Sequence, residues 1–388
     1  MTLFKGNKSF TGEESVEIAA HGSPYILQAI LKTLTAAGCR MAEPGEFTMR
    51  AFMNGKMDLS QAEAVADLIA SQSRNAHEIA LKQLRGKFST ELKDLREKLI
   101  HFASLVELEL DFAEEDVEFA DRKELKLLLE EVLLYLKRLI QSFELGNAIK
   151  NGVPVAIVGE PNTGKSTLLN QLLGEERAIV SNIAGTTRDV IEETLNIDGI
   201  LFRLIDTAGI REGAEEIEAM GIERSFAKIE LATIVLCMAD LSRANHFEQV
   251  ISWAKQLLQK HPNKKVLIVA NKSDIAQKEI EKCEINTIKL SAKSGHNIEE
   301  LKSVLVQQVL GNFDLNQDTI VSNARHVEAL EKTVRSLEQA RSGLEANVTA
   351  DFVAMDIRQA MYWLGTITGQ ISEDDLLANI FSKFCIGK

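Results

Sequence analysis

The nine residues "GEPNTGKST", Gly159 to Thr167, constrain the fold more than any other stretch of this chain. They match the pattern GxxxxGK[ST], follow the apolar run "VPVAIV" and precede the helical stretch "STLLNQLL". In such a turn the backbone N–H groups and the following helix N-terminus cradle phosphates. A chance glycine-rich turn would lack these flanks. We therefore predict a phosphate-binding loop in an α/β domain.

The surrounding sequence has the texture of buried strands alternating with helices. From Val153 to about Gly311, helical or polar stretches separate four further apolar runs: "LFRLID", "ATIVLCMA", "KVLIVAN" and "NTIKLSA". Short, continuously apolar runs of this kind are typical of parallel strands covered on both faces. The pattern predicts a doubly wound α/β domain at residues 151–312.

Two helical stretches flank this domain. At residues 55–150 and again at 313–388, apolar residues recur every three or four positions, as in long amphipathic helices. Because the termini of a domain are often close together, we predict that the α/β domain is inserted into one helical domain. Residues 1–54, rich in turn signals, are small for an independent core and form a fourth piece that belongs to something larger.

Composition limits the compartment and the partners. The 388 residues carry a net charge of -13, which repels nucleic acid, so any RNA contact needs a local basic patch or a partner. No apolar run has the length of a signal peptide or a membrane span, which predicts a cytoplasmic protein. The four cysteines are widely spaced without a CxxC pair, which argues against structural zinc and a disulfide framework.

Three further motifs specify the nucleotide. In "DTAG", Asp206 to Gly209, the carboxylate can hold the Mg²⁺ shell and the glycine N–H can meet the γ-phosphate. In "NKSD", Asn271 to Asp274, the aspartate can accept from both N1–H and the 2-amino group of guanine, and "SAK", Ser291 to Lys293, can donate backbone N–H to O6. Adenine would leave Asp274 unpaired, and sites of this kind discriminate by about 10⁴ to 10⁵. The predicted nucleotide is GTP.

The loop "SNIAGTTRD", Ser181 to Asp189, lies between these motifs and is a candidate switch, although an ordinary threonine-rich turn is the alternative. Thr187 would complete the Mg²⁺ shell with the γ-phosphate bound and be released after hydrolysis. The predicted GTP contacts are Asn162, Thr163, Gly164, Lys165, Ser166, Thr167, Ser181, Asn182, Ile183, Ala184, Gly185, Thr186, Thr187, Asp206, Thr207, Ala208, Gly209, Asn271, Lys272, Asp274, Ser291, Ala292 and Lys293, with Ser166 and Thr187 as Mg²⁺ ligands.

These motifs resemble the G domains of the TrmE/Era/Obg-like GTPases, and the flanks narrow the resemblance to the MnmE (TrmE) family of tRNA-modification GTPases. The stretches that carry it are "SFTGEESVEI", "HGSP", "RMAEPGEFTMRAFMNGKMDLSQAEAVADLI", "GEPNTGKSTLLN", "AIVSNIAGTTRDV", "DTAGIRE", "GIERS" and the terminal "FCIGK". The resemblance implies a Ras-like P-loop GTPase domain inserted into an α-helical domain, preceded by a partial α+β folate-binding domain.

The resemblance also assigns the hydrolytic machinery. Ile210 follows "DTAG" where Ras-type proteins place the glutamine that orients water, so another group must act. By resemblance, K⁺ takes the place of an arginine finger and is bound by Asn162, Ser181, Ile183 and Thr186. Glu218 would orient the attacking water, although from the residues alone it reads as a solvated helix-start glutamate.

In this family the N-terminal domain binds 5,10-methylene- or 5-formyl-tetrahydrofolate and forms the homodimer. Glu17, Lys56 and the terminal Lys388 match its ligand-contacting positions, with plain surface charges as the alternative. Family members usually carry further residues before "SFTGEE", including an arginine that contacts the folate. The chain is therefore expected to be N-terminally shortened, which bears on folate binding and dimerisation.

The terminal "SEDDLLANIFSKFCIGK" predicts a final helix, with Ser372 as N-cap, an apolar face that includes Phe384, and Gly387 as stop signal. Cys385 then lies in the last turn, where orphan carbonyls disfavour a thiolate, and local physics favours an inert cysteine. The resemblance instead makes Cys385 catalytic in tRNA modification.

Two functions are open from the sequence. One is GTP hydrolysis coupled to adding a carboxymethylaminomethyl-type group at C5 of a tRNA wobble uridine. By resemblance to the family, this requires a partner, MnmG (GidA), that uses FAD and NADH and forms a heterotetramer. The other is a GTP-dependent switch in ribosome assembly without covalent chemistry. The flanks favour the first, because nothing after Gly311 resembles a compact RNA-binding module.

Overall fold

The computed structural model describes residues 1–111, 122–176, 193–205, 229–276, 283–315, 317–346, 348–371, 374–384 and 387. Within them the chain divides into two compact units. One, the helical unit, contains residues 1–71, 77–143 and 319–388; the other, the α/β unit, contains residues 72–76 and 144–318.

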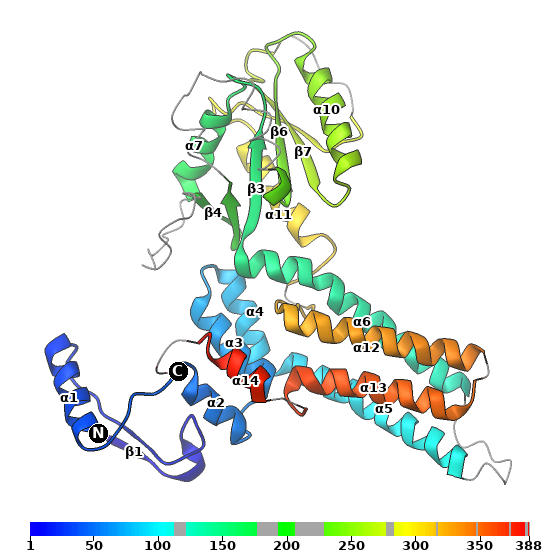
Figure 1. Ribbon diagram of the computed structural model, residues 1–388. Coiled ribbons are helices and arrows are strands. Elements are labelled where there is room, and N and C mark those ends of the chain that lie inside the picture. Colours follow the sequence, from blue (N-terminus) through cyan, green and yellow to red (C-terminus); the bar gives the residue numbers. More distant parts are fainter. Residues whose placement is uncertain are drawn as a thin grey trace. The chain divides into compact units, whose positions relative to one another are not determined.

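The α/β unit is built on a six-stranded sheet with the order β4-β5-β3-β6-β7-β8 (Figure 1). The strands are β3 (Val153–Val158), β4 (Glu193–Ile197), β5 (Ile200–Leu204), β6 (Ile234–Asp240), β7 (Lys265–Asn271) and β8 (Thr287–Lys289). All neighbours are parallel except β4 and β5, which form an antiparallel hairpin. The predicted parallel sheet is therefore confirmed.

Burial explains why these runs became strands. Every residue of β6 is buried, and β3 and β7 are buried over most of their length, as expected for strands covered on both faces. The helices of this unit that lie in the described residues include α7 (Lys165–Glu176), α10 (His246–Lys260) and α11 (Ile298–Leu310). At the hairpin, Asp198 and Gly199 both take positive φ, at 49° and 79°, as a two-residue turn of this hand requires.

The helical unit is organised around long amphipathic helices. The helices that lie wholly or mostly in this unit are α3 (Leu59–Ala70), α4 (Arg74–Leu84), α5 (Lys87–Asp111), α6 (Arg122–Asn151), α12 (Ala324–Glu345), α13 (Ala350–Thr368) and the shorter α14 (Asp374–Phe381). The apolar stripes of α5, α6, α12 and α13 meet in one core, in which Phe88, Leu129 and Leu337 are almost fully buried. No helix in the described part of the chain is both long enough and apolar enough to cross a membrane.

A buried ion cluster joins three of these helices. Glu63 of α3 accepts two hydrogen bonds from the Arg325 guanidinium of α12, at 2.9 and 2.8 Å, and lies 2.7 Å from Nε2 of His326. The same guanidinium donates to the carbonyls of Thr366 and Ile367, in the last turn of α13. Burial alone would raise the pKa of Glu63, but the His326 and Arg325 charges hold that pKa well below its usual value.

The N-terminal segment contains β1 (Thr2–Phe4), η1 (Gly6–Lys8), β2 (Ser15–Glu17), α1 (Pro24–Ala36) and α2 (Glu46–Met53). The strands β1 and β2 form an antiparallel pair of their own. Glu46 at the start of α2 accepts from the guanidinium groups of Arg40 and Arg50, both at 2.7 Å. These two arginines, with a backbone N–H from Glu43, hold the pKa of Glu46 near 2.

The terminal helix α14 packs on α2 and α3. Phe381 and Phe384 lie in a cluster with Leu59, and Phe52 contacts Phe381 with ring centroids 6.4 Å apart. The apolar face predicted for this segment is thus buried as expected. The helix ends at Phe381, however, earlier than predicted, since the predicted last turn included Cys385. The backbone N–H groups of Lys383 and Phe384 donate i→i+3 hydrogen bonds to the carbonyls of Ile380 and Phe381, which tighten the end of the helix.

Gly45 makes this packing possible. Its φ is 70°, and a Cβ there would lie 2.6 Å from the carbonyl oxygen of Phe381 and 3.1 Å from Cβ of Phe384. Real Cβ atoms do not approach a backbone oxygen so closely. The residue immediately before Cys385 is therefore seated against the start of α2 through contacts that only glycine permits.

Candidate nucleotide-binding site

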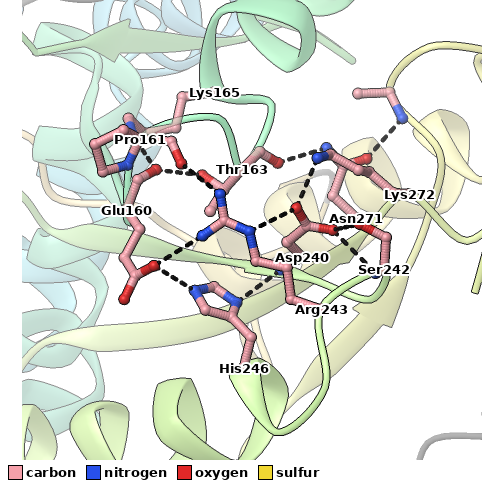
Figure 2. Close-up of polar contacts among 11 residues, drawn as sticks. Glu160, Pro161, Thr163, Lys165, Asp240, Ser242, Arg243, His246, Asn271 and Lys272 are labelled. Carbon is pink, nitrogen blue, oxygen red and sulfur yellow. Dashed lines mark hydrogen bonds and ion pairs between the residues drawn. The ribbon is translucent and has the colours of Figure 1, made fainter. Parts of the chain in front are cut away.

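The phosphate-binding loop lies between β3 and α7, as its sequence predicted. Asn162 takes a left-handed conformation with φ of 64°, and the buried Thr163 hydroxyl donates to the carbonyl of Glu160 at 2.8 Å. The Lys165 ammonium donates to the carbonyls of Gly159 and Glu160, both at 2.7 Å (Figure 2). The loop is thereby closed on itself at the N-terminus of α7, where backbone N–H groups and the helix dipole favour an anion.

Asn271, the last residue of β7, joins three of the predicted motifs. Its Nδ2 donates to the carbonyl of Thr163 at 2.8 Å, and its Oδ1 accepts from the backbone N–H of Ala292 at 2.9 Å. Gly164 has a φ of 96°, and a Cβ there would overlap Nδ2 of Asn271. The glycine of the loop is thus required by the asparagine of the guanine motif as well as by its own backbone conformation.

Asp274, the side chain predicted to recognise guanine, is placed as a hydrogen-bond acceptor. Asp274 is exposed, and the Ser291 hydroxyl, followed by the aspartate's own backbone N–H, holds the pKa of its carboxyl below the usual value. At neutral pH this group is an ionised acceptor for paired N–H donors. Lys272 has a left-handed backbone, with φ of 64°, between Asn271 and Asp274.

Sequence reasoning missed a polar cluster beside the loop, which contains Glu160, Asp240, Arg243 and His246 (Figure 2). Asp240 is the last residue of β6 and its side chain is only 1% exposed. Burial would raise the pKa of Asp240, but the Lys272 ammonium and the donors of Ser242 hold it below the usual value. The missed signal was its position: a carboxylate at the carboxyl end of a central parallel strand, where ligands of α/β sheets bind.

Several predicted site residues lie outside the described residues. They are Ser181, Asn182, Ile183, Ala184, Gly185, Thr186, Thr187, Asp206, Thr207, Ala208, Gly209, Glu218, Cys385 and Lys388. Their assignments, including most of the K⁺ and switch-loop ligands, stay predictions. The described members of the site, Asn162–Thr167, Asn271–Asp274 and Ser291–Lys293, all belong to the α/β unit.

Of the two described folate candidates, one lies in a strand and the other, Lys56, in the turn between α2 and α3. Glu17 is exposed in β2, opposite Thr2 of β1. The Lys56 ammonium donates to the carbonyl and side-chain oxygens of Asn7, at 2.8 and 3.0 Å. Among the described residues no hydrogen bond or ion pair joins Glu17 to Lys56, and their folate role stays a prediction.

Comparison with known proteins identifies the family. The family model of the MnmE helical domain matches residues 59–385, which is most of the chain, and the model of the GTP-binding protein TrmE N-terminus matches residues 1–56. The chain belongs to the MnmE family. Its resemblance to that family, expected from the motifs, is confirmed over both flanks of the α/β unit.

Curated MnmE relatives align along the whole chain. The chain is 53% identical over 397 residues to the tRNA modification GTPase MnmE of Flavobacterium johnsoniae, and 50% identical over 400 residues to that of Bacteroides thetaiotaomicron. The protein of the same name from Christiangramia forsetii is 52% identical over 404 residues. In all three comparisons the alignment covers 100% of this chain and 85% of the relative.

Proposed function

We propose that this chain is a GTPase that acts in tRNA modification, as the names of its MnmE relatives state for those proteins. The observation that carries the proposal is the side chain of Asn271, which bonds both to the phosphate-binding loop and to the segment Ser291–Lys293. One residue thus sets the distance between the phosphate end and the guanine end of a single site.

Each end of the site has a defined task. The Lys165 ammonium would exchange its hydrogen bonds to two loop carbonyls for hydrogen bonds to β- and γ-phosphate oxygens. The Asp274 carboxylate would accept hydrogen bonds from N1–H and the 2-amino group of guanine. The Ser166 hydroxyl, exposed in the first turn of α7, fits as a Mg²⁺ ligand together with Thr187. Bound Mg²⁺ would offset the charge that develops on the phosphate oxygens.

The finer assignments are proposals that follow from the family resemblance. K⁺ bound by Asn162, Ser181, Ile183 and Thr186 would stimulate hydrolysis, with Glu218 orienting water. A one-carbon tetrahydrofolate would contact Glu17, Lys56 and Lys388, and the N-terminal domain would form the homodimer. With the FAD-dependent partner MnmG, the protein would add a carboxymethylaminomethyl-type group to C5 of the wobble uridine, in the cytoplasm. The proposed G domain, 151–312, would be inserted into the helical domain.

The coupling of the two activities can be tested at the terminal motif. We expect Cys385→Ser to abolish wobble-uridine modification while leaving GTP hydrolysis unchanged, because the cysteine is proposed to act in the modification alone. Nucleoside analysis of tRNA from cells carrying the variant, beside the GTPase rate of the purified protein, measures both. If cells lacking the gene kept an unchanged modification profile, the protein would instead be the GTP-dependent switch.

The K⁺ site can be tested in the same protein. At equal ionic strength we expect GTP turnover to be at least about tenfold faster in K⁺ than in Na⁺. A fixed positive charge beside the negative charge that develops in the transition state should accelerate the reaction as much as one hydrogen-bond donor of an oxyanion hole does. Asn162→Ala should remove the difference. Asn297→Ala is the matched control, because Asn297 has a similar left-handed backbone, φ 59°, at the N-cap of α11. Equal rates in the two salts would exclude a K⁺ role.

A further inference from the structure

Asp240 holds a buried negative charge at the centre of the polar cluster. Its Oδ1 accepts from the backbone N–H and the hydroxyl of Ser242, at 2.9 and 2.6 Å, and its Oδ2 lies 2.6 Å from the Lys272 ammonium (Figure 2). A carboxylate that is 1% exposed is costly unless donors and a counter-charge surround it. Here both are present, so this side chain has a single, well-determined orientation.

One arm of the cluster reaches the guanine motif. Asp240 lies directly opposite Asn271 in the parallel pairing of β6 and β7, so its carboxylate stands beside the residue that follows Asn271. That residue is Lys272, whose φ of 64° is unfavourable for a side chain with a Cβ. The ion pair with Asp240 therefore fixes both the ammonium and the strained backbone that leads to Asp274.

The other arm reaches the phosphate-binding loop through Arg243. Its Nε lies 3.4 Å from Oδ2 of Asp240, its Nη1 donates to Oε2 of Glu160 at 3.0 Å, and its Nη2 donates to the carbonyl of Pro161 at 3.3 Å. A planar guanidinium donates in fixed directions within one plane, whereas the three donors of an ammonium rotate about a single bond. Arg243 thus holds the two loop residues that precede Asn162.

His246 closes the network. Its Nδ1 accepts from the backbone N–H of Asp240 at 3.0 Å, so in the neutral ring the proton is on Nε2, which lies 3.3 Å from Oε2 of Glu160. Glu160 is therefore held from two sides, by Arg243 and by His246. Both contacts lead back to Asp240, one to its side chain and the other to its backbone.

We propose that Asp240 is a positioning residue for the guanine nucleotide, tying Lys272 and the guanine-reading loop on one side to the Glu160–Pro161 segment of the phosphate-binding loop on the other. The inference rests on the proposed function, because the ligand is the nucleotide assigned there. Asp240 acts through Lys272 and Arg243. It sets the spacing between base and phosphate subsites in addition to the direct link made by Asn271.

The decisive measurement compares the binding of GDP with that of inosine diphosphate, which lacks the 2-amino group from which Asp274 would accept a hydrogen bond. Asp240→Asn keeps the size of the side chain but removes the charge facing Lys272. We expect it to weaken GDP binding about tenfold or more, because a charge-assisted hydrogen bond is lost. We also expect the affinity ratio of GDP to inosine diphosphate to fall toward one, a change that a general loss of stability would not produce.

Arg243→Gln tests the contact with the phosphate-binding loop separately from the contact with Lys272. It should weaken GDP and inosine diphosphate equally, by about threefold, since this ion pair is partly exposed and the base subsite is untouched. Because the Arg243 side chain is 42% exposed, the variant is not expected to affect folding, and it keeps the proposal testable if Asp240→Asn does not fold. The control is Lys255→Gln on α10, which removes the exposed ion pair between Lys255 and Glu284.

The outcomes are distinct. If folded Asp240→Asn binds GDP as the wild type does, or loses GDP and inosine diphosphate affinity by the same factor, the positioning role is wrong. If Arg243→Gln leaves both affinities unchanged, the link to the phosphate-binding loop is wrong. Failure of the wild-type protein to bind GDP would instead overturn the proposed function itself.

Discussion

Replacing Glu63 by glutamine is expected to lower the free energy of unfolding of the helical unit by about 3 kcal/mol, the cost of breaking a buried charge pair by removing one partner. The glutamine amide would point a donor at Arg325 or His326, where the carboxylate now accepts. Since 1 kcal/mol shifts the melting temperature of a unit of this size by about 2–4 °C, the shift should be about 6–12 °C. Thermal unfolding and hydrogen exchange in α3, α12 and α13 measure it.

The control for this change is Glu97→Gln. Glu97 forms an exposed ion pair with Lys93 on α5, 3.9 Å apart, and the loss of this pair should cost no more than about 0.5 kcal/mol.

The stabilisation by Glu63 should also depend on pH. Because the pKa of Glu63 is lower in the folded state, its contribution is complete above the unfolded pKa, about 4.3, and is lost as the pH falls toward the folded pKa. A wild-type advantage that persisted unchanged well below pH 4 would contradict the ion cluster as its source.

The second large effect is expected from Gly45→Ala. The new Cβ would approach the carbonyl oxygen of Phe381 to 2.6 Å, so α14 must move away from α2. We expect faster hydrogen exchange at the amides of Leu377–Phe381 and loss of tRNA modification, because the segment preceding Cys385 no longer packs against the start of α2. GTP hydrolysis should be unaffected, since every described residue of the nucleotide site belongs to the α/β unit.

Gly55→Ala distinguishes this clash from simple backbone strain. Gly55 has nearly the same backbone, with φ of 68° against 70° at Gly45, but a Cβ there would meet nothing within 4 Å. Both variants carry the strain of a left-handed residue, about 1–2 kcal/mol, and only Gly45→Ala carries the steric conflict. If the two variants modified tRNA equally well, the packing of Phe381 and Phe384 against Gly45 would not be required for modification.

Much of the fold could be predicted because its signals are local. The buried runs around Ile234–Asp240 and Lys265–Asn271 are continuous and apolar, and the three- and four-residue spacing of residues such as Leu92 and Leu129 identifies the helices. The end of α14 was predicted too late, since the sequence placed Cys385 in the last helical turn. The helix ends at Phe381, where i→i+3 hydrogen bonds tighten the chain and Phe381 packs against Gly45, a long-range contact that helix-stop signals do not contain.

The nucleotide motifs were visible because each combines fixed residue types with a fixed place after a strand. Asp240 and Arg243 were missed because their role depends on which strands are neighbours: β6 lies between β3 and β7, so residues after its end meet both the phosphate-binding and guanine-reading loops. Strand order is a property of the assembled sheet. A polar residue such as His246, which belongs to no recognisable sequence motif, gives no indication of its role by itself.

The hydrogen bond from Asn271 to the carbonyl of Thr163 also has a consequence for the order in which the protein is made. The two residues are 108 positions apart, so a growing chain that already contains the whole phosphate-binding loop still lacks one of its fixed contacts. The loop can take its final form only once β7 has been synthesised and paired with β6. Guanine nucleotides would therefore be bound by completed sheets in preference to nascent ones, and a bound nucleotide would stabilise the finished unit against reopening.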